Sequence, residues 1–147
     1  MQFTFSPAAE SDFERLLLIR HAAMRPSLEH VGRWHPDRAR ARFRAAFAAG
    51  ETRLILVAET LAGCVALRSA GDALELDQFY LDPALHGRGL GTAVLTQLLA
   101  EADAAAKPVI LTALQDSAAI RLYERHGFVQ TGAEDYDLFY RRAVKVL

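Results

Sequence analysis

The chain has 147 residues, of which 52% are hydrophobic and 24% charged, and its formal net charge is −1. This composition predicts one domain over residues 1–147, and it gives no electrostatic reason to expect nucleic acid or an anionic membrane as a partner. The apolar runs are too short to span a bilayer, no signal peptide is visible, and the single cysteine, Cys64, cannot form an intrachain disulfide. We therefore expect a cytoplasmic protein in which Cys64 is a small core residue.

The first predicted elements are a short strand over residues 2–5 and two helices. Ser11 and Glu14 fit a capping box at the start of the first helix. Because a proline disfavours helical backbone in the residue before it, Pro26 predicts that this helix ends at or before Arg25. The arginines of the second helix do not fall on one stripe, so we interpret them as a solvated face.

Three strands and a long helix are predicted in the middle of the chain. Strands over 53–58 and 63–68 have the spacing of an antiparallel hairpin, although no Asn-Gly pair fixes the turn type. A strand over 74–81 alternates with period two and ends at a proline turn, and a helical pattern begins at Leu90. The remaining predicted elements are a strand over residues 109–114, a helix that Asp116 or Ser117 can cap and that ends before Gly127, and two closing strands over 128–131 and 136–142.

A glycine-rich stretch, residues 86–91 (HGRGLG), lies between that strand and the long helix. Glycines let backbone N–H groups come close to a ligand, and the free N–H groups at the start of a helix favour an anion. The stretch therefore predicts a phosphate-binding loop. It lacks the lysine of a P-loop and the third glycine of a dinucleotide-binding motif, which speaks against a nucleotide-phosphate enzyme.

The same stretch resembles the (Q/R)-x-x-G-x-G/A motif of the GCN5-related N-acetyltransferases (GNAT), with His86 at the Gln/Arg position and Gly89 and Gly91 as the glycines. Residues 122–128 (LYERHGF) are similar to the family's L-Y-E-x-x-G-F. The resemblance spans residues 3–142. It implies an α/β (α+β) fold, a mixed and mostly antiparallel sheet of about seven strands flanked by about four helices and splayed between the fourth and fifth strands.

The resemblance implies an acyltransferase that uses acetyl-CoA as cosubstrate, needs no metal, and moves the acetyl group directly to a primary amine of a small molecule or peptide. The alternative is a catalytically inactive coenzyme A-binding module of the same fold. We expect no nucleic-acid or membrane partner. The oligomeric state is open, a homodimer included, as are the identity of the acceptor and the acyl chain preference.

Acetyl transfer needs a base, a donor to the thioester oxygen and an acid for the leaving thiolate, because an alkylamine with a pKa of about 10.4 is mostly ammonium at neutral pH. The resemblance makes Glu75 the first candidate for the base, because it lies four residues before Phe79, where the family often places a glutamate. Asp77 or a water chain are the alternatives, and either acid could simply be solvent-facing. The resemblance implies that the Phe79 N–H donates to the thioester oxygen. It makes Tyr123 the general acid, against the alternative of a buried structural tyrosine.

Two residues depart from the family pattern. His86 replaces the Gln or Arg of the first motif, with Arg88 placed to compensate. The asparagine that the family usually has before the second motif is Asp116 or Ser117 here, and Ser117 is preferred as a ligand because an aspartate repels phosphate. The coenzyme A contacts implied by the resemblance are Phe79, Tyr80, Leu81, His86, Gly87, Arg88, Gly89, Leu90, Gly91, Thr92, Ser117 and Tyr123. The candidate acceptor contacts are Met24, His30, Trp34, Asp77, Tyr136 and Tyr140, and the alternative for each is an ordinary core or surface residue. An aromatic cluster with His30 could hold a small amine or an amino-acid side chain.

Overall fold

The computed structural model describes residues 2–146, and its sheet has seven strands in the order β1-β2-β3-β4-β5-β7-β6. The described residues also form four α-helices, which confirms the predicted α/β fold and the predicted order of elements. The chain divides into two compact units: unit 1 comprises residues up to Ala66 and Gln78–Leu90, and unit 2 comprises Leu67–Asp77 and residues from Gly91 onward. Strands β3 (Thr60–Ala70) and β4 (Ala73–Leu81) contribute residues to both units.

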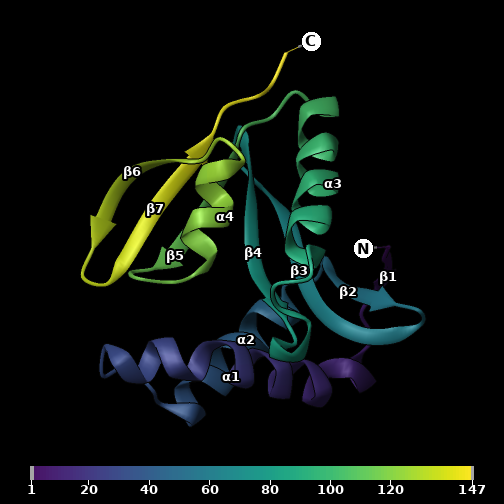
Figure 1. Cartoon of the computed structure of the whole chain (residues 1–147), viewed down its shortest axis with the longest axis vertical. Helices are drawn as coiled ribbons and strands as arrows, with labels where there is room; N and C mark the ends of the chain where they lie inside the picture. The colour runs from purple at the N-terminus through teal and green to yellow at the C-terminus, as the bar shows by residue number, and fades with distance from the viewer. Residues whose placement is uncertain (1, 147) are drawn as a thin grey trace. The chain divides into compact units, whose positions relative to one another are not determined.

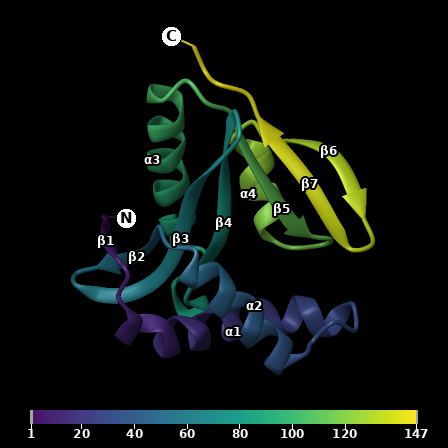
Figure 2. The same cartoon turned by 180° about the vertical axis from the view of Figure 1, so that it is seen from behind.

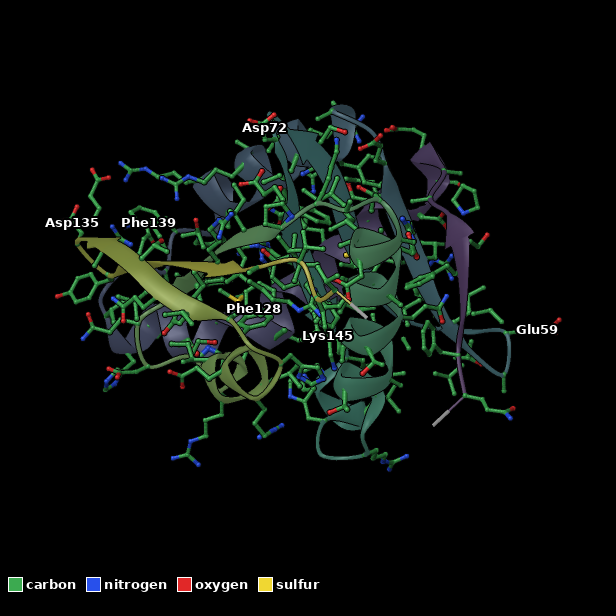
Figure 3. The ribbon with its side chains drawn as sticks, turned by 90° about the horizontal axis from the view of Figure 1, so that it is seen from above. Glu59, Asp72, Phe128, Asp135, Phe139 and Lys145 are labelled. Atoms are coloured by element: carbon green, nitrogen blue, oxygen red, sulfur yellow. The ribbon has the colours of Figure 1, made fainter. Side chains whose placement is uncertain are left out.

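Unit 1 begins with the part of the chain up to Ala66, drawn from purple to teal in Figure 1. Phe13 and Phe43 stack with ring centroids 5.5 Å apart and join its two helices. Strands β1 and β2 pair antiparallel, and the turn between β2 and β3 uses left-handed backbone at Ala58 and Glu59, without glycine; Glu59 is labelled at its tip in Figure 3. The complete elements of unit 1 are β1 (Thr4–Pro7), η1 (Glu10–Asp12), α1 (Phe13–His30), α2 (Pro36–Ala48), β2 (Thr52–Val57) and η2 (Pro83–Leu85).

Two predictions for the first helix are wrong. Helix α1 continues through Pro26 to His30, because contacts on both sides of the proline hold the last turns: Arg25 hydrogen-bonds Glu29 at 3.2 Å and lies over the Trp34 ring. The capping box of Ser11 and Glu14 does not form. Instead, the N–H of Ala9 donates to the Asp12 carboxylate at 2.7 Å, within the short 3-10 turn that precedes α1.

Unit 2 holds the other elements, and Figure 2 shows β5, β6 and β7 side by side in it. Strand β7 pairs antiparallel with both β5 and β6, and Asp135 lies at the tip of the β6–β7 turn (Figure 3). The parallel register between β4 and β5 consists of Leu74 with Val109 and Glu75 with Ile110, as expected of strands that splay apart. The elements of unit 2, with α3 starting one residue before it, are α3 (Leu90–Ala104), β5 (Val109–Leu114), α4 (Ala119–Arg125), β6 (Val129–Glu134) and β7 (Asp137–Arg142).

An ion pair fastens α3 to β7 within unit 2. Both Nη atoms of Arg142 donate to the Asp103 carboxylate, at 2.8 and 3.0 Å, and the backbone N–H of Lys145 donates to it at 2.9 Å. These bonds favour the charged carboxylate and lower the pKa of Asp103 to about 2. Leu95 and Leu98 of α3 are fully buried, so this helix contributes an apolar stripe as well.

Candidate functional site

The end of β4 in unit 1 carries a local distortion. Gln78 has a φ of 51°, which is rare for a residue with a side chain, and the Tyr80 O–H donates to its amide oxygen at 2.8 Å. A Cβ built on Gly63 of the neighbouring strand would lie 2.0 Å from the Tyr80 carbonyl oxygen, so only glycine allows the two strands to approach here. Gly63, an isolated glycine in a strand pattern, is the sequence signal that could have found this close approach. The distortion immediately precedes Phe79, the predicted donor.

The predicted phosphate-binding loop follows η2 in unit 1. Gly87 and Gly89 have φ values of 76° and 81°, and a Cβ on either would meet no atom within 4 Å, so the loop surface is open. Within residues 2–146, no hydrogen bond occupies the backbone N–H of Gly87, Arg88 or Gly89. Three free donors on glycine-rich backbone are what an anionic ligand requires.

His86 anchors this loop to the strand end. Its Nε2 lies 3.0 Å from the Leu81 carbonyl oxygen, and because a carbonyl can only accept, Nε2 is the protonated nitrogen. The imidazole is therefore engaged by the protein itself. Leu90, 1% exposed, is a core residue at the start of α3, and Gly91 and the exposed Thr92 belong to the first helical turn, whose N–H groups lack intrahelical partners.

The two candidate bases lie in unit 2 and differ in their surroundings. Burial raises the pKa of the half-buried Glu75, the nearby Asp77 raises it further, and Arg68 opposes both. Asp77 itself is engaged in an ion pair with Arg68. A carboxylate with a raised pKa and no such bond in the described part of the chain is the better proton acceptor, so the geometry favours Glu75 over Asp77.

Tyr123 and Ser117 lie on and just before α4, also in unit 2. Tyr123 is 8% exposed, and its ring meets Phe128 edge-on with centroids 5.6 Å apart. Ser117 Oγ accepts the Ala119 N–H at 3.3 Å, which ties the preceding loop to the helix and leaves its own O–H to donate elsewhere. Asp116 has a φ of 65°, a left-handed backbone that aspartate adopts more readily than most residues with a side chain.

The candidate acceptor residues are divided between the units. Met24 is half-buried on α1, His30 is exposed at the end of that helix, and Trp34 follows it. A ring contact that the structure does place at Trp34 comes from His21, 5.0 Å away and edge-on, and not from His30. Unit 2 holds the others, where Asp77 is paired, Tyr136 is exposed, and Tyr140 is 3% exposed with its pKa raised by burial and by Glu124.

Sequence reasoning missed two residues of α1. Arg20 is only 9% exposed, and His21 carries a buried Nδ1; neither that atom nor Arg20 Nη1 has a hydrogen-bond partner in the described structure. Burial lowers the pKa of His21, and the charges of Arg20 and Arg40 lower it further. The sequence did hold a signal, because Arg20 falls on the apolar stripe that also contains Leu16 and Leu17.

Unit 2 also contains a cavity, and none of the residues predicted above for coenzyme A or the acceptor lines it. The cavity, of about 680 Å³, runs between α3, the end of α4 and the residues after β7, and Lys145 on its rim is labelled in Figure 3. Among residues 2–146, no group of three or more His, Cys, Asp or Glu side chains is placed to hold a metal ion. No helix in the same part of the chain is long and apolar enough to cross a bilayer.

Comparison with known proteins decides the family. The model of the acetyltransferase (GNAT) family matches residues 16–128, most of the chain. The chain belongs to this family. This confirms the resemblance seen in the glycine-rich loop and in residues 122–128, whereas a search of curated protein sequences gives no significant match.

Solved GNAT structures share its fold at low sequence identity. The PaiA N-acetyltransferase of Thermoplasma acidophilum, solved with coenzyme A, has a TM-score of 0.77 at 14% identity, covering 97% of this chain and 99% of its own. The ribosomal-protein-S18-alanine N-acetyltransferase of Escherichia coli has a TM-score of 0.74 at 20% identity, covering 99% and 96%. Ard1 of Thermoplasma volcanium has a TM-score of 0.71 at 19% identity, covering 99% and 100%.

Proposed function

We propose that this chain is an acetyl-CoA-dependent N-acetyltransferase, which moves an acetyl group directly to a primary amine of a small molecule or peptide. The observation that carries the proposal is the open loop with free N–H groups at Gly87, Arg88 and Gly89, in a chain that the GNAT family model matches. A relative of the same fold binds coenzyme A, which supports the same ligand here. The proposal also includes a single domain and a cytoplasmic location, and it is compatible with either a monomer or a homodimer.

The loop fits the pyrophosphate of acetyl-CoA through its backbone. At Gly87 and Gly89 no side chain stands between the backbone and a phosphate oxygen, and the first turn of α3 adds further free N–H groups. Arg88, exposed between the two glycines, supplies a positive charge. Ser117 and Tyr123 join the proposed contacts through the family resemblance alone.

Acetyl-CoA supplies an activated acetyl thioester, and three groups of the chain serve the transfer. The Phe79 N–H donates to the thioester oxygen as negative charge grows on it, a contribution of about 2.7–4 kcal/mol for one such donor. Glu75 accepts the proton of the ammonium, directly or through water, which offsets a cost of about 4–5 kcal/mol at neutral pH. The Tyr123 O–H donates to the sulfur of the leaving thiolate.

A coenzyme A release assay tests the proposal. Acetyl-CoA is incubated with primary amines, amino acids, polyamines and peptide N-termini, and free thiol is measured over time; release that depends on an amine is the expected result. Acetyl-CoA should also raise the melting temperature, whereas NAD and ATP should not. Stabilisation by acetyl-CoA without release on any amine would support the inactive coenzyme A-binding module instead, and equal stabilisation by all three ligands would refute the coenzyme A assignment.

A further inference from the structure

A buried positive charge on α1 has no negative partner. Arg20 is 9% exposed, and its Nη1 is a buried donor without a hydrogen bond. Within residues 2–146 no ion pair or hydrogen bond reaches any part of this guanidinium; its cation–π contact is with the Tyr80 ring, whose centroid is 5.8 Å from Cζ. A ring face attracts the charge but accepts none of its N–H groups in a full hydrogen bond. Arginine also cannot lose its proton to relieve the cost of burial.

Several exposed arginines of α1 and α2, in contrast, are paired with acidic side chains. Arg15 is paired with Asp12 at 2.8 Å and Arg25 with Glu29 at 3.2 Å. On α2, Arg40 and Arg44 are paired with acids of α1 and η1. These pairs lie where water screens them and where a partner is least needed, whereas the buried Arg20 lacks one. A fold optimised for stability alone would not leave the charge in this state.

The position of Arg20 connects it with the proposed reaction centre. Tyr80 follows Phe79 directly, so their Cα atoms are about 3.8 Å apart. The Tyr80 ring is held in place, because its O–H donates to Gln78 and Phe43 meets it edge-on at 6.1 Å. Arg20 therefore lies beside the same short segment of β4 whose backbone is proposed to face the thioester.

We propose that Arg20 binds a carboxylate of the acceptor, and that the acceptor is therefore a small amino acid or a related molecule whose amine and carboxylate are a short chain apart. This inference rests on the proposed function and names its substrate class. A planar guanidinium matches a carboxylate in a two-point hydrogen bond. The anion supplies the charge that the folded chain lacks.

A singly charged group fits better than a phosphate. His21, whose Nδ1 is also a buried atom without a hydrogen bond, is kept neutral by burial and by the charges of Arg20 and Arg40, which lower its pKa. The local site thus offers one full positive charge from Arg20, and a phosphate dianion would remain half uncompensated. The neutral His21 can still donate or accept one hydrogen bond.

Matched acceptors test the assignment. Each amino acid that supports coenzyme A release is compared with its carboxamide, which keeps the shape and removes the charge. We expect kcat/KM to be about 10- to 100-fold higher for the acid, the range of a hydrogen bond to a charged group. Arg20→Gln should remove this preference by lowering the rate with the acid and leaving the rate with the amide. Arg15→Gln, an exposed arginine of the same helix, should keep it.

Two outcomes of that comparison would overturn the proposal. One is equal use of acid and amide by the unaltered protein, and the other is an Arg20→Gln variant that retains the preference. Faster acetylation of aminoalkyl phosphonates than of the matching amino acids would also overturn it, because Arg20 would then bind a phosphate-like group in place of a carboxylate.

Thermal unfolding provides a readout without turnover. Amino acids added to the coenzyme A-bound protein should raise its melting temperature, their amides should not, and Arg20→Gln should abolish the rise.

Without ligand, the Arg20→Met variant should melt about 2–4 °C higher than the unaltered protein, because the substitution removes an unpaired buried charge and keeps the length of the side chain. A lower melting temperature would show that Arg20 serves the fold and would contradict the proposal. A protein that binds the acids without transferring acetyl would refute the proposed function and leave the role of Arg20 standing.

Discussion

The two units carry different kinds of functional group. Unit 1 offers backbone: within the described residues, the free N–H groups on the loop at Gly87 to Gly89, and the strand end whose Phe79 N–H is proposed to donate to the thioester oxygen. Unit 2 offers ionisable side chains, the half-buried Glu75 and the buried Tyr123. Backbone donors bind a ligand and hold it, and ionisable side chains move protons. Substitutions in the loop should therefore change coenzyme A affinity, and substitutions of the unit 2 side chains should change turnover.

The largest expected effect is on Glu75 in unit 2. Glu75→Gln should lower kcat by about 10²–10⁴-fold, the usual contribution of a general base, with little change in coenzyme A affinity. Because burial raises the pKa of Glu75, kcat/KM of the unaltered protein should fall as pH drops through that raised value, where the carboxylate becomes protonated. The variant should lose this acidic limb of the profile. Glu134→Gln, at an exposed acid of β6, is the control.

Tyr123→Phe should lower kcat by about 10²-fold, the lower end of the range for general acids, since water partly replaces the lost donor. The ring still packs on Phe128, so the free energy of unfolding should change by no more than about 1 kcal/mol. Coenzyme A titration and steady-state rates measure the two effects separately. Unaltered turnover would remove Tyr123 from the mechanism, and a large loss of stability would make it a structural residue.

Gly89→Val should weaken coenzyme A binding by about 10- to 100-fold. Its φ of 81° costs a β-branched residue about 1–3 kcal/mol, and the side chain also keeps the phosphate away from the backbone. Gly71→Val is a matched control, because Gly71 has a φ of 63° and equal free space, in the turn between β3 and β4. Isothermal titration should show the loss in affinity with the first variant only. Equal losses in both would attribute the effect to general strain.

His86→Ala should have the smallest effect, a loss of coenzyme A affinity of less than about 10-fold. The substitution removes one hydrogen bond, from Nε2 to the Leu81 carbonyl, which anchors the loop without leaving the imidazole to the ligand. His86→Gln, which restores a residue of the family motif with an amide donor, should bind as the unaltered protein does. Affinity that depends more on His86 than on Gly89 would contradict a site made of backbone groups.

Most of the fold was predictable because it follows periodic patterns and backbone signals. The strand over 109–114 is found at those residues, and the glycines of the loop adopt the left-handed backbone that only glycine adopts freely. The failures are places where distant contacts override local preference. Helix α1 passes through Pro26 because Trp34 and neighbouring side chains hold its end, and no local rule contains that contact.

The backbone parts of the candidate site could be located from local signals, whereas Glu75 and Tyr123 became candidates only through the family resemblance. The loop and the strand end could be located from glycines and a proline turn. Arg20 could not be interpreted from the sequence, because an arginine on an apolar stripe can extend to water or remain buried, and only the packed structure distinguishes these. The left-handed backbone of Gln78 and the close approach of β3 at Gly63 likewise become visible only in the packed structure.

The most direct test of the account follows the acetyl group itself. Acetyl-CoA with an isotopically labelled acetyl group is mixed with the protein and a panel of amino acids, and the products are analysed by mass spectrometry. The account predicts the label on the amine of an amino acid, one free coenzyme A for each labelled product, and no label on the protein. Acetyl-CoA that remains bound and intact with every acceptor, or a label that accumulates on the protein chain, would contradict it.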